Sequence, residues 1–155
     1  MLGHYVPCRQ CRRCLARKRA HWKHRMVAES RHWAKTWFLT LTYSDKHIDD
    51  YHYSQVQTYL KRVRKTQTTP IRYVCTTEFE SKGSRTSNPH HHLIIYTGPL
   101  AKHRDFTHKW DNGFSVLKHV KHIGKRQHVN KFTGNTHPAA YVAKYLVKEG
   151  ERNRS

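Results

Sequence analysis

Two histidines in this sequence have the spacing of metal ligands. The residues at 89–92 read Pro-His-His-His and lead directly into the apolar segment 93–96. Side chains alternate along a strand, so His90 and His92 share a face about 7 Å apart, and His91 points the other way. Two imidazoles on one face can converge on a single metal ion.

A carboxylate can complete this group. Glu78 lies on the strand predicted before the histidines, and an antiparallel neighbour places its side chain beside theirs. Two histidines and one carboxylate leave coordination positions open for water and a phosphate. Glu80 shares the face of Glu78, so the pattern leaves both as candidates for the third ligand.

Two tyrosines near the end of the sequence have the spacing of paired nucleophiles. Tyr141 and Tyr145 are four residues apart, which places them about 6 Å from each other on one helix face. Each is followed three residues later by a lysine, Lys144 and Lys148. A phenol with a pKa near ~10 is a poor nucleophile at neutral pH, but a nearby ammonium and a metal-polarised phosphate would both help it attack phosphorus. Two such groups at one site predict two transesterifications, one that cuts a strand and one that rejoins it.

Each of these patterns also has a simpler explanation. In a chain with fifteen histidines a triplet can arise by chance, and a tyrosine pair at helical spacing more often packs in a core. A glutamate on a strand is more often a solvated residue. Their joint occurrence, after a threonine-rich strand at 36–43 and with a large positive charge, favours the chemical interpretation.

Three cysteines near the start have the spacing of a zinc site. Cys8, Cys11 and Cys14 form a C-x-x-C-x-x-C run, and Cys75 lies far from them in the sequence. Spacings of two residues suit thiolates that share one zinc ion, and the arginines among them favour the thiolate form. A structural zinc site needs four ligands, so His4 or Cys75 would complete it. The alternative is three reduced thiols at the start of a helix.

The composition indicates a nucleic-acid partner. The 155 residues include 30 Lys plus Arg and 10 Asp plus Glu, a net charge of +20, with 12% aromatic residues. Such a charge calls for a polyanion, with an anionic membrane surface as the weaker alternative. We expect no membrane protein, since no apolar run approaches the ~18 residues of a span, and neither a secreted disulfide scaffold nor a typical small-molecule enzyme. The residues expected to contact DNA lie in the basic segments 9–25 and 118–131, and are Arg12, Arg13, Arg17, Lys18, Arg19, Lys125 and Arg126.

The periodicity of the sequence predicts an α+β domain built on an antiparallel sheet. A capping box of Ser54 and Gln57 is expected at the start of one helix. We expect residues 1–35 to form a basic, cysteine-rich helical extension and residues 36–148 to form the catalytic core of a single domain. The expected elements are strands at 36–43, 71–80, 90–96 and 114–120, helices at 10–34, 54–66, 103–110 and 138–148, a loop at 81–88, and a mobile loop or irregular hairpin at 121–136.

Together these motifs resemble the rolling-circle replication initiators of small single-stranded DNA phages, the gokushovirus-type microviruses, which are HUH endonucleases. The similarity runs nearly end to end, and the motifs occur in the order of replication initiators. His91 stands where the family has a hydrophobic or aromatic residue, which leaves a shifted frame open, although alternation and Pro89 favour His90 and His92. The matching segments are the cysteine run, Phe38-Leu39-Thr40-Leu41-Thr42-Tyr43, Glu78-Phe79, Pro89-His90-His91-His92, Trp110 with Asn112, Gly113, Phe114 and Val116, and Ala140-Tyr141-Val142-Ala143-Lys144-Tyr145.

The resemblance implies a fold and a mechanism. The fold would be a sheet of about five antiparallel strands with helices against one face, the histidine pair on a central strand and the tyrosine helix beside it. A Mg²⁺ or Mn²⁺ ion held by His90, His92 and, by position, Glu78 would polarise a phosphate of single-stranded origin DNA. A tyrosine would attack and leave a 5′-phosphotyrosine link and a free 3′-OH, and the second tyrosine would end the round. Single-tyrosine relatives carry a lysine three residues after the tyrosine, which favours Tyr141 for the first cut.

The resemblance also implies partners and a location. A host polymerase would extend the 3′-OH, and a host helicase would open the strands, because no phosphate-binding G-x-x-x-x-G-K-[ST] motif is present. We expect a monomer in the cytoplasm of a bacterial host. Two other functions stay open from the residues: a non-catalytic, zinc-stabilised nucleic-acid-binding protein, and a hydrolytic metallonuclease that uses a water bound at the two histidines and the glutamate.

Overall fold

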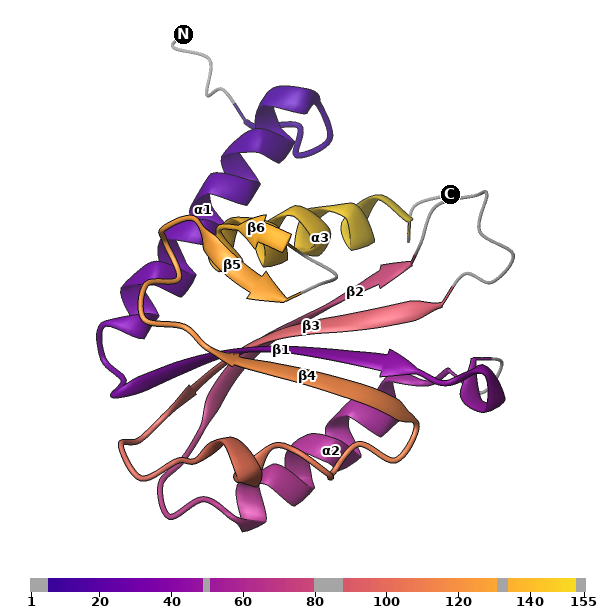
Figure 1. Cartoon of the computed structure of the whole chain (residues 1–155). Coiled ribbons are helices and arrows are strands. Elements are labelled where there is room, and N and C mark those ends of the chain that lie inside the picture. The colour runs from indigo at the N-terminus through magenta and orange to yellow at the C-terminus, as the bar shows by residue number, and fades with distance from the viewer. Residues whose placement is uncertain (1–5, 49–50, 80–87, 131–133, 153–155) are drawn as a thin grey trace, which may run out of the picture.

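The chain folds around an antiparallel sheet that has helices on both of its faces (Figure 1). The computed structural model describes residues 6–48, 51–79, 88–130 and 134–152. The strands are β1 (Lys35–Tyr43), β2 (Arg72–Phe79), β3 (Pro89–Thr97), β4 (Gly113–His119), β5 (Gln127–Asn130) and β6 (Gly134–Thr136). The helices are α1 (Arg12–Ser30), α2 (Tyr53–Lys65) and α3 (Pro138–Arg152), with short 3-10 turns η1 at Asp45–His47 and η2 at His103–Asp105.

The main sheet has the strand order β2-β3-β1-β4, and every neighbouring pair in it is antiparallel. The α+β class and the antiparallel sheet are therefore confirmed. Among the described residues this sheet has four strands, one fewer than the resemblance implied. β5 and β6 form a separate hairpin whose register shifts between His128 and Asn130, so the irregular hairpin is the alternative found at 121–136.

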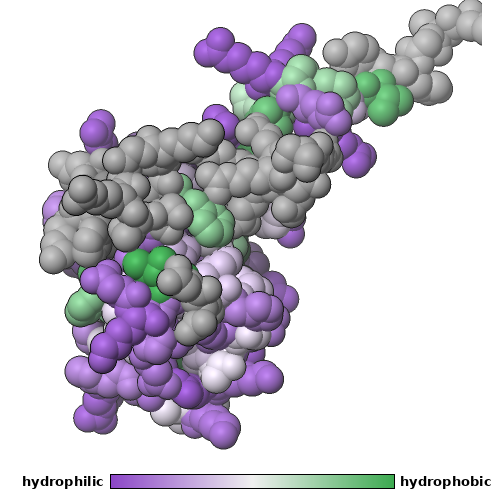
Figure 2. All heavy atoms as spheres, turned by 90° about the vertical axis from the view of Figure 1, so that its right-hand side faces the viewer, coloured by the Kyte–Doolittle hydropathy of each residue, from purple (hydrophilic) through white to green (hydrophobic). Residues whose placement is uncertain are grey.

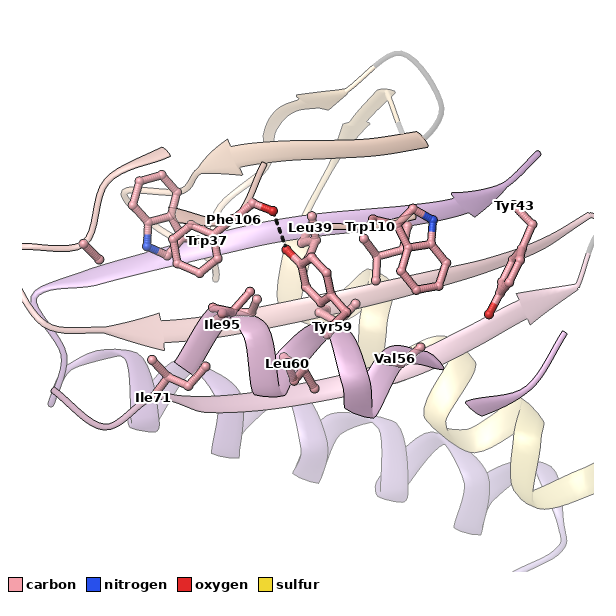
Figure 3. Packing of buried hydrophobic residues seen from close by; sticks show 14 residues of the cluster. Trp37, Leu39, Tyr43, Val56, Tyr59, Leu60, Ile71, Ile95, Phe106 and Trp110 are labelled. Carbon is pink, nitrogen blue, oxygen red and sulfur yellow. Dashed lines mark hydrogen bonds between the residues drawn. The ribbon is translucent and has the colours of Figure 1, made fainter. Parts of the chain in front are cut away.

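Helices cover both faces because the central strands are apolar on both sides. Every residue of β1 from Thr36 to Tyr43 is buried. On one face Trp37 packs with Tyr59 of α2, whose hydroxyl donates a hydrogen bond of 2.9 Å to the carbonyl of Phe106 (Figure 3). On the other face Phe38 packs with residues of α1 and α3. The expectation of helices against one face is wrong, since a strand that is apolar throughout must be covered on two sides.

Three local expectations are corrected by the structure. α1 occupies Arg12–Ser30, shorter at both ends than the expected 10–34. The capping box of α2 uses His52 and Gln55, because the helix begins at Tyr53, one residue earlier than expected. The helix expected at 103–110 is only the turn η2, and His108, with a φ of 58°, cannot continue a right-handed helix.

The described surface is mostly hydrophilic on the face shown in Figure 2, with apolar side chains in small groups. The first half of α1 extends away from the sheet and carries the basic residues of the sequence motif (Figure 1). No helix in the described ranges is long and apolar enough to cross a bilayer.

Candidate active site

The strand register brings the candidate metal ligands together. Glu78 on β2 pairs with His90 on β3, and His90 pairs with Thr42 on β1. One step along, Thr76, His92 and Thr40 form the next row. In an antiparallel sheet, side chains of paired residues lie on the same face. Glu78 and the two histidines therefore share the face over which α3 lies (Figure 1).

Two threonines orient the histidine rings. Nδ1 of His90 is hydrogen-bonded to Oγ1 of Thr42 at 3.0 Å, and Nδ1 of His92 to Oγ1 of Thr40 at 3.1 Å. When the ring donates through Nδ1, Nε2 is the nitrogen that can bind a metal ion. Neither threonine was among the residues predicted for the site. The signal was present in the sequence, since Thr40 and Thr42 alternate along β1 as the histidines do along β3.

Both tyrosines of α3 reach the carboxylate of Glu78. Tyr141 donates its hydroxyl to Oε2 at 2.8 Å, and Tyr145 donates to Oε1. Nε2 of His92 lies 3.0 Å from the same Oε2. The rings of Tyr141 and Tyr145 have centroids 5.1 Å apart, and that of Tyr141 is 5.0 Å from His92. Glu78, His92 and the two tyrosines thus form one hydrogen-bonded cluster.

This cluster sets the charge of its members. Burial opposes the charge of Glu78, but hydrogen bonds with His92, Tyr145 and Tyr141 outweigh it and lower the pKa of the carboxyl group to about 2. Burial and the bond to Glu78 raise the pKa of Tyr145 to about 12, and the same causes raise the pKa of Tyr141. At neutral pH the cluster therefore holds one carboxylate and two protonated phenols.

The remaining predicted residues of this site are placed less closely. Nζ of Lys144 lies 5.0 Å from the ring centroid of Tyr145, a cation–π distance. The side chain of Lys148 and all of Glu80 lie outside the described part of the chain. The choice between Glu78 and Glu80 thus stays as the sequence left it, with Glu78 now placed in contact with His92 and both tyrosines.

His91 lies on the opposite face from its two neighbours. Its Nε2 is hydrogen-bonded to the hydroxyl of Tyr43 at 3.1 Å, and its Nδ1 to Oγ1 of Thr77 at 3.0 Å. The side chain is fully buried, and burial, together with the charges of His92 and His90, lowers its pKa to about 3. His91 therefore acts as a neutral, buried link between β1, β2 and β3.

We expect His91 to make the fold sensitive to acid. The unfolded chain binds a proton on this histidine below a pH of about 6.5, whereas the folded chain does not until about pH 3. The stability of the wild type should therefore fall by about 1.4 kcal/mol per pH unit as pH drops through this window, on account of His91 alone. Urea unfolding of His91→Gln at several pH values should show a slope smaller by this amount. The exposed His24→Gln is the control, and equal slopes for wild type and His91→Gln would contradict the prediction.

The donor set of this site suits a divalent cation, although its atoms do not surround one point. The rings of His90 and His92 have centroids 6.4 Å apart, and Glu78 is engaged by the tyrosines. The carboxylate is ionised and the histidines are held through Nδ1, as in metal sites of proteins. In the same row as His92, Thr76 has a buried hydroxyl with no hydrogen-bond partner within the described ranges. A group bound here would give that hydroxyl a partner.

The three N-terminal cysteines form a second group. Among the described residues, Cys8, Cys11 and Cys14 are the only three or more His, Cys, Asp or Glu side chains whose ligand atoms all lie within 4.8 Å of one another. These three cysteines lie close enough to hold a metal ion. Backbone N–H groups of Cys11 and Gln10 point at Cys8 and lower the pKa of its thiol to about 7.

The fourth ligand is not supplied by Cys75. Cys75 lies on β2 and packs against the cluster on the α2 face, whereas α1 packs on the other face. The expectation that Cys75 joins the other three is therefore not met by this structure. His4 lies outside the described residues.

The residues predicted to contact DNA are all exposed. Five of them lie on α1, where the only acidic residue is Glu29. The other two lie in the segment between β4 and β5. The set comprises Arg12, Arg13, Arg17, Lys18, Arg19, Lys125 and Arg126, and its DNA contacts stay a prediction.

Comparison with known proteins places this cluster in a family. Residues 36–150, from β1 into α3, match the family model of the ORF2-type replication-associated proteins. The chain belongs to this family. The match includes Glu78, His90, His92 and both tyrosines, and leaves α1 and the cysteine triad outside it. The resemblance to phage replication initiators is confirmed at this level.

Members of the family from phages are similar over most of this chain. Replication-associated protein VP4 of Bdellovibrio phage phiMH2K is 26% identical over 92% of this chain and 48% of its own length. Replication-associated protein ORF2 of Spiroplasma virus 4 is 26% identical over 93% of this chain and 48% of its own length. The chain thus spans about half the length of these relatives. Among solved structures, the hypothetical protein ORF119 from Sulfolobus islandicus rod-shaped virus 1 aligns with a TM-score of 0.47 and 12% identity, over 81% of this chain and 90% of that one.

Proposed function

We propose that this chain initiates rolling-circle DNA replication by nicking and rejoining single-stranded origin DNA, with Tyr141 and Tyr145 as nucleophiles. The observation that supports this most directly is the meeting of both hydroxyls at Glu78, which is itself bonded to His92. Two nucleophiles at one carboxylate suit a reaction that is run twice, once to cut and once to join. Residues 36–148 would be the catalytic core of a single HUH-type domain, and residues 1–35 an extension that holds DNA.

In the cutting step the hydroxyl oxygen of one tyrosine would attack the scissile phosphorus. The tyrosine oxygen becomes bonded to phosphorus, the bond from phosphorus to the 3′ oxygen breaks, the tyrosine loses its proton and the 3′ oxygen gains one. The second tyrosine would later attack the regenerated junction in the same way. Lys144 lies close enough to Tyr145 to stabilise the developing negative charge, and we assign Lys148 the same task from its spacing.

His90, His92 and Glu78 would hold a Mg²⁺ or Mn²⁺ ion, which supplies polarisation of the scissile phosphate when it is bound. The ionised state of Glu78 and the threonine bonds at Nδ1 of the histidines support this assignment. A host polymerase would extend the free 3′-OH and a host helicase would open the strands. The protein would act as a monomer inside the bacterial host cell.

The test is incubation of the protein with labelled single-stranded origin DNA and Mn²⁺, followed by denaturing electrophoresis. An adduct that survives SDS and disappears when EDTA is added is the expected result. Cleavage without an adduct would instead support hydrolysis by a water bound at the histidines and the glutamate. DNA binding with neither cleavage nor adduct would support the non-catalytic, zinc-stabilised binder.

We further propose that Cys8, Cys11 and Cys14 bind a zinc ion. The sulfurs of Cys8 and Cys14 lie 3.7 Å apart, and the backbone N–H of Cys11 donates to the sulfur of Cys8 at 3.3 Å. The turn that produces this contact holds Arg9 at a φ of 61°, a conformation that non-glycine residues seldom adopt. Amide hydrogen bonds to sulfur stabilise the thiolate, which is the form that binds zinc.

We expect the full-length protein to bind one Zn²⁺ per chain and to lose it in Cys11→Ser. The variant Cys75→Ser, which changes the cysteine on β2, should keep the metal. Substitution with Co²⁺ gives a direct measurement, because thiolate ligands produce a sulfur-to-cobalt charge-transfer absorption. Absence of that absorption in the reduced wild type, or its equal loss in both variants, would contradict the zinc assignment.

A further inference from the structure

A cavity of about 370 Å³ lies between α1 and the edge strand β2, on the same face of the sheet as the candidate active site. Trp22, Arg25 and Glu29 line it from α1, and Arg72 and Tyr73 line it from β2. Its volume is at the lower end of the ~300–1,000 Å³ that small-molecule sites occupy. None of these residues is used by the proposed cutting reaction.

The walls of the cavity combine aromatic rings with cations. Trp22 is half-buried, and the guanidinium of Arg25 lies 4.5 Å from its ring centroid. Tyr73 is also half-buried, and the guanidinium of Arg64 lies 5.5 Å from its ring. Arg25 and Arg72 are exposed at the rim. Rings that can stack on a base, beside cations that can pair with phosphates, are the usual features of single-strand binding sites.

The wall of the cavity also holds a fixed hydrogen-bond acceptor. Glu29 accepts a hydrogen bond of 2.7 Å from Nε1 of Trp33, and the guanidinium of Arg72 donates to both of its oxygens at 3.1 and 3.2 Å. The bond from Trp33 is the main cause of a lowered pKa of Glu29, so the carboxylate is ionised at neutral pH. A carboxylate can accept a hydrogen bond from the exocyclic amino group of cytosine, but thymine has no such group.

The position of the cavity relates it to the tyrosines. Tyr96 lines the cavity from β3 and lies four residues after His92 on the same face of that strand, hence about 13 Å away. A DNA strand whose phosphate reaches the active site would therefore pass the cavity within a few nucleotides.

We propose that this cavity binds one amino-bearing base of the single-stranded DNA substrate, stacked on Trp22 or Tyr73 with its amino group on Glu29. This inference rests on the proposed function, since it assumes that single-stranded DNA is the ligand. It adds a site that recognises a base away from the scissile phosphate. The rim arginines would pair with the flanking phosphates.

The first experiment compares Trp22→Ala with Trp22→Phe on two probes. One probe is a deoxycytidine oligomer of about 12 nucleotides, within the ~4–16 nucleotides that single-strand sites cover. The other is an abasic strand with the same number of phosphates. Loss of stacking should weaken binding of the oligomer by Trp22→Ala by about 5- to 150-fold and leave binding of the abasic strand unchanged. Trp22→Phe keeps an aromatic ring and should restore most of the affinity.

The salt dependence of binding separates this effect from a loss of charge. Trp22→Ala should lower the affinity without altering the slope of log K against log salt concentration. Arg19→Ala, a charge variant on the same helix, should reduce the magnitude of that slope by about 1. Equal weakening by Trp22→Ala on the normal and the abasic strands would overturn the base site.

The second experiment tests the choice of base. The wild type should bind the deoxycytidine oligomer at least about 5-fold more tightly than a thymidine oligomer of equal length, and Glu29→Ala should remove this preference. Equal affinity of the wild type for both oligomers would overturn the role of Glu29. If the wild type failed to bind any of these strands, the proposed function itself would fail. Covalent cutting of DNA without a base effect at Trp22 would refute only this inference.

Discussion

The variant that changes both Tyr141 and Tyr145 to Phe should form no SDS-resistant adduct with single-stranded origin DNA. Because a covalent bond to the protein needs the phenolic oxygen, adduct formation should fall by at least about 1,000-fold, as when other enzymes lose their nucleophile. Each single variant should keep an adduct, since either hydroxyl reaches the carboxylate of Glu78. The double variant should still bind the DNA strand, because its rings and the surrounding charges are retained.

Labelled DNA and denaturing gels measure this result, and thermal unfolding confirms that the variants are folded. Tyr53→Phe is the matched control, because Tyr53 begins α2 on the other face of the sheet. An adduct that persists in the double variant would show that another side chain is the nucleophile. Loss of all cleavage in only one single variant would assign the first cut to that tyrosine.

Local periodicity was enough to predict which side chains share a face. Alternation separates His91 from His90 and His92, and the helical repeat puts Tyr141 next to Tyr145, as the structure has them. What periodicity does not contain is the register between strands. Glu78 meets His90 because β2 and β3 pair in one particular alignment, and that alignment depends on contacts between residues far apart in sequence.

Other differences have particular physical causes. His52 was missed as a helix cap because histidine is not among the residues usually preferred there. The segment 36–43 is apolar on both of its faces, which is typical of a strand covered on two sides, yet the family resemblance was followed to a sheet covered on one. The cavity beside Trp22 depends on how α1 lies against the edge of the sheet, which no pattern within α1 can show.

Glu78→Gln should separate the metal from the fold. The amide has the shape of the carboxylate but not its charge, so a divalent cation at His90 and His92 would lose its anionic ligand. The rate of adduct formation at low Mn²⁺ should fall on the order of 100-fold, and the Mn²⁺ concentration for half-maximal cleavage should rise at least about 10-fold. Cleavage measured over a series of Mn²⁺ concentrations gives both quantities.

The control for this prediction is Glu80→Gln, the other carboxylate that the sequence pattern allows. If Glu78 is the ligand, Glu80→Gln should behave as the wild type, and the reverse result would transfer the role to Glu80. Comparison with Mn²⁺ binding in the absence of DNA distinguishes a lost ligand from a displaced tyrosine. A lost ligand weakens binding of the metal itself, whereas a change confined to the tyrosine hydroxyls at Glu78 alters the rate and leaves the metal affinity unchanged.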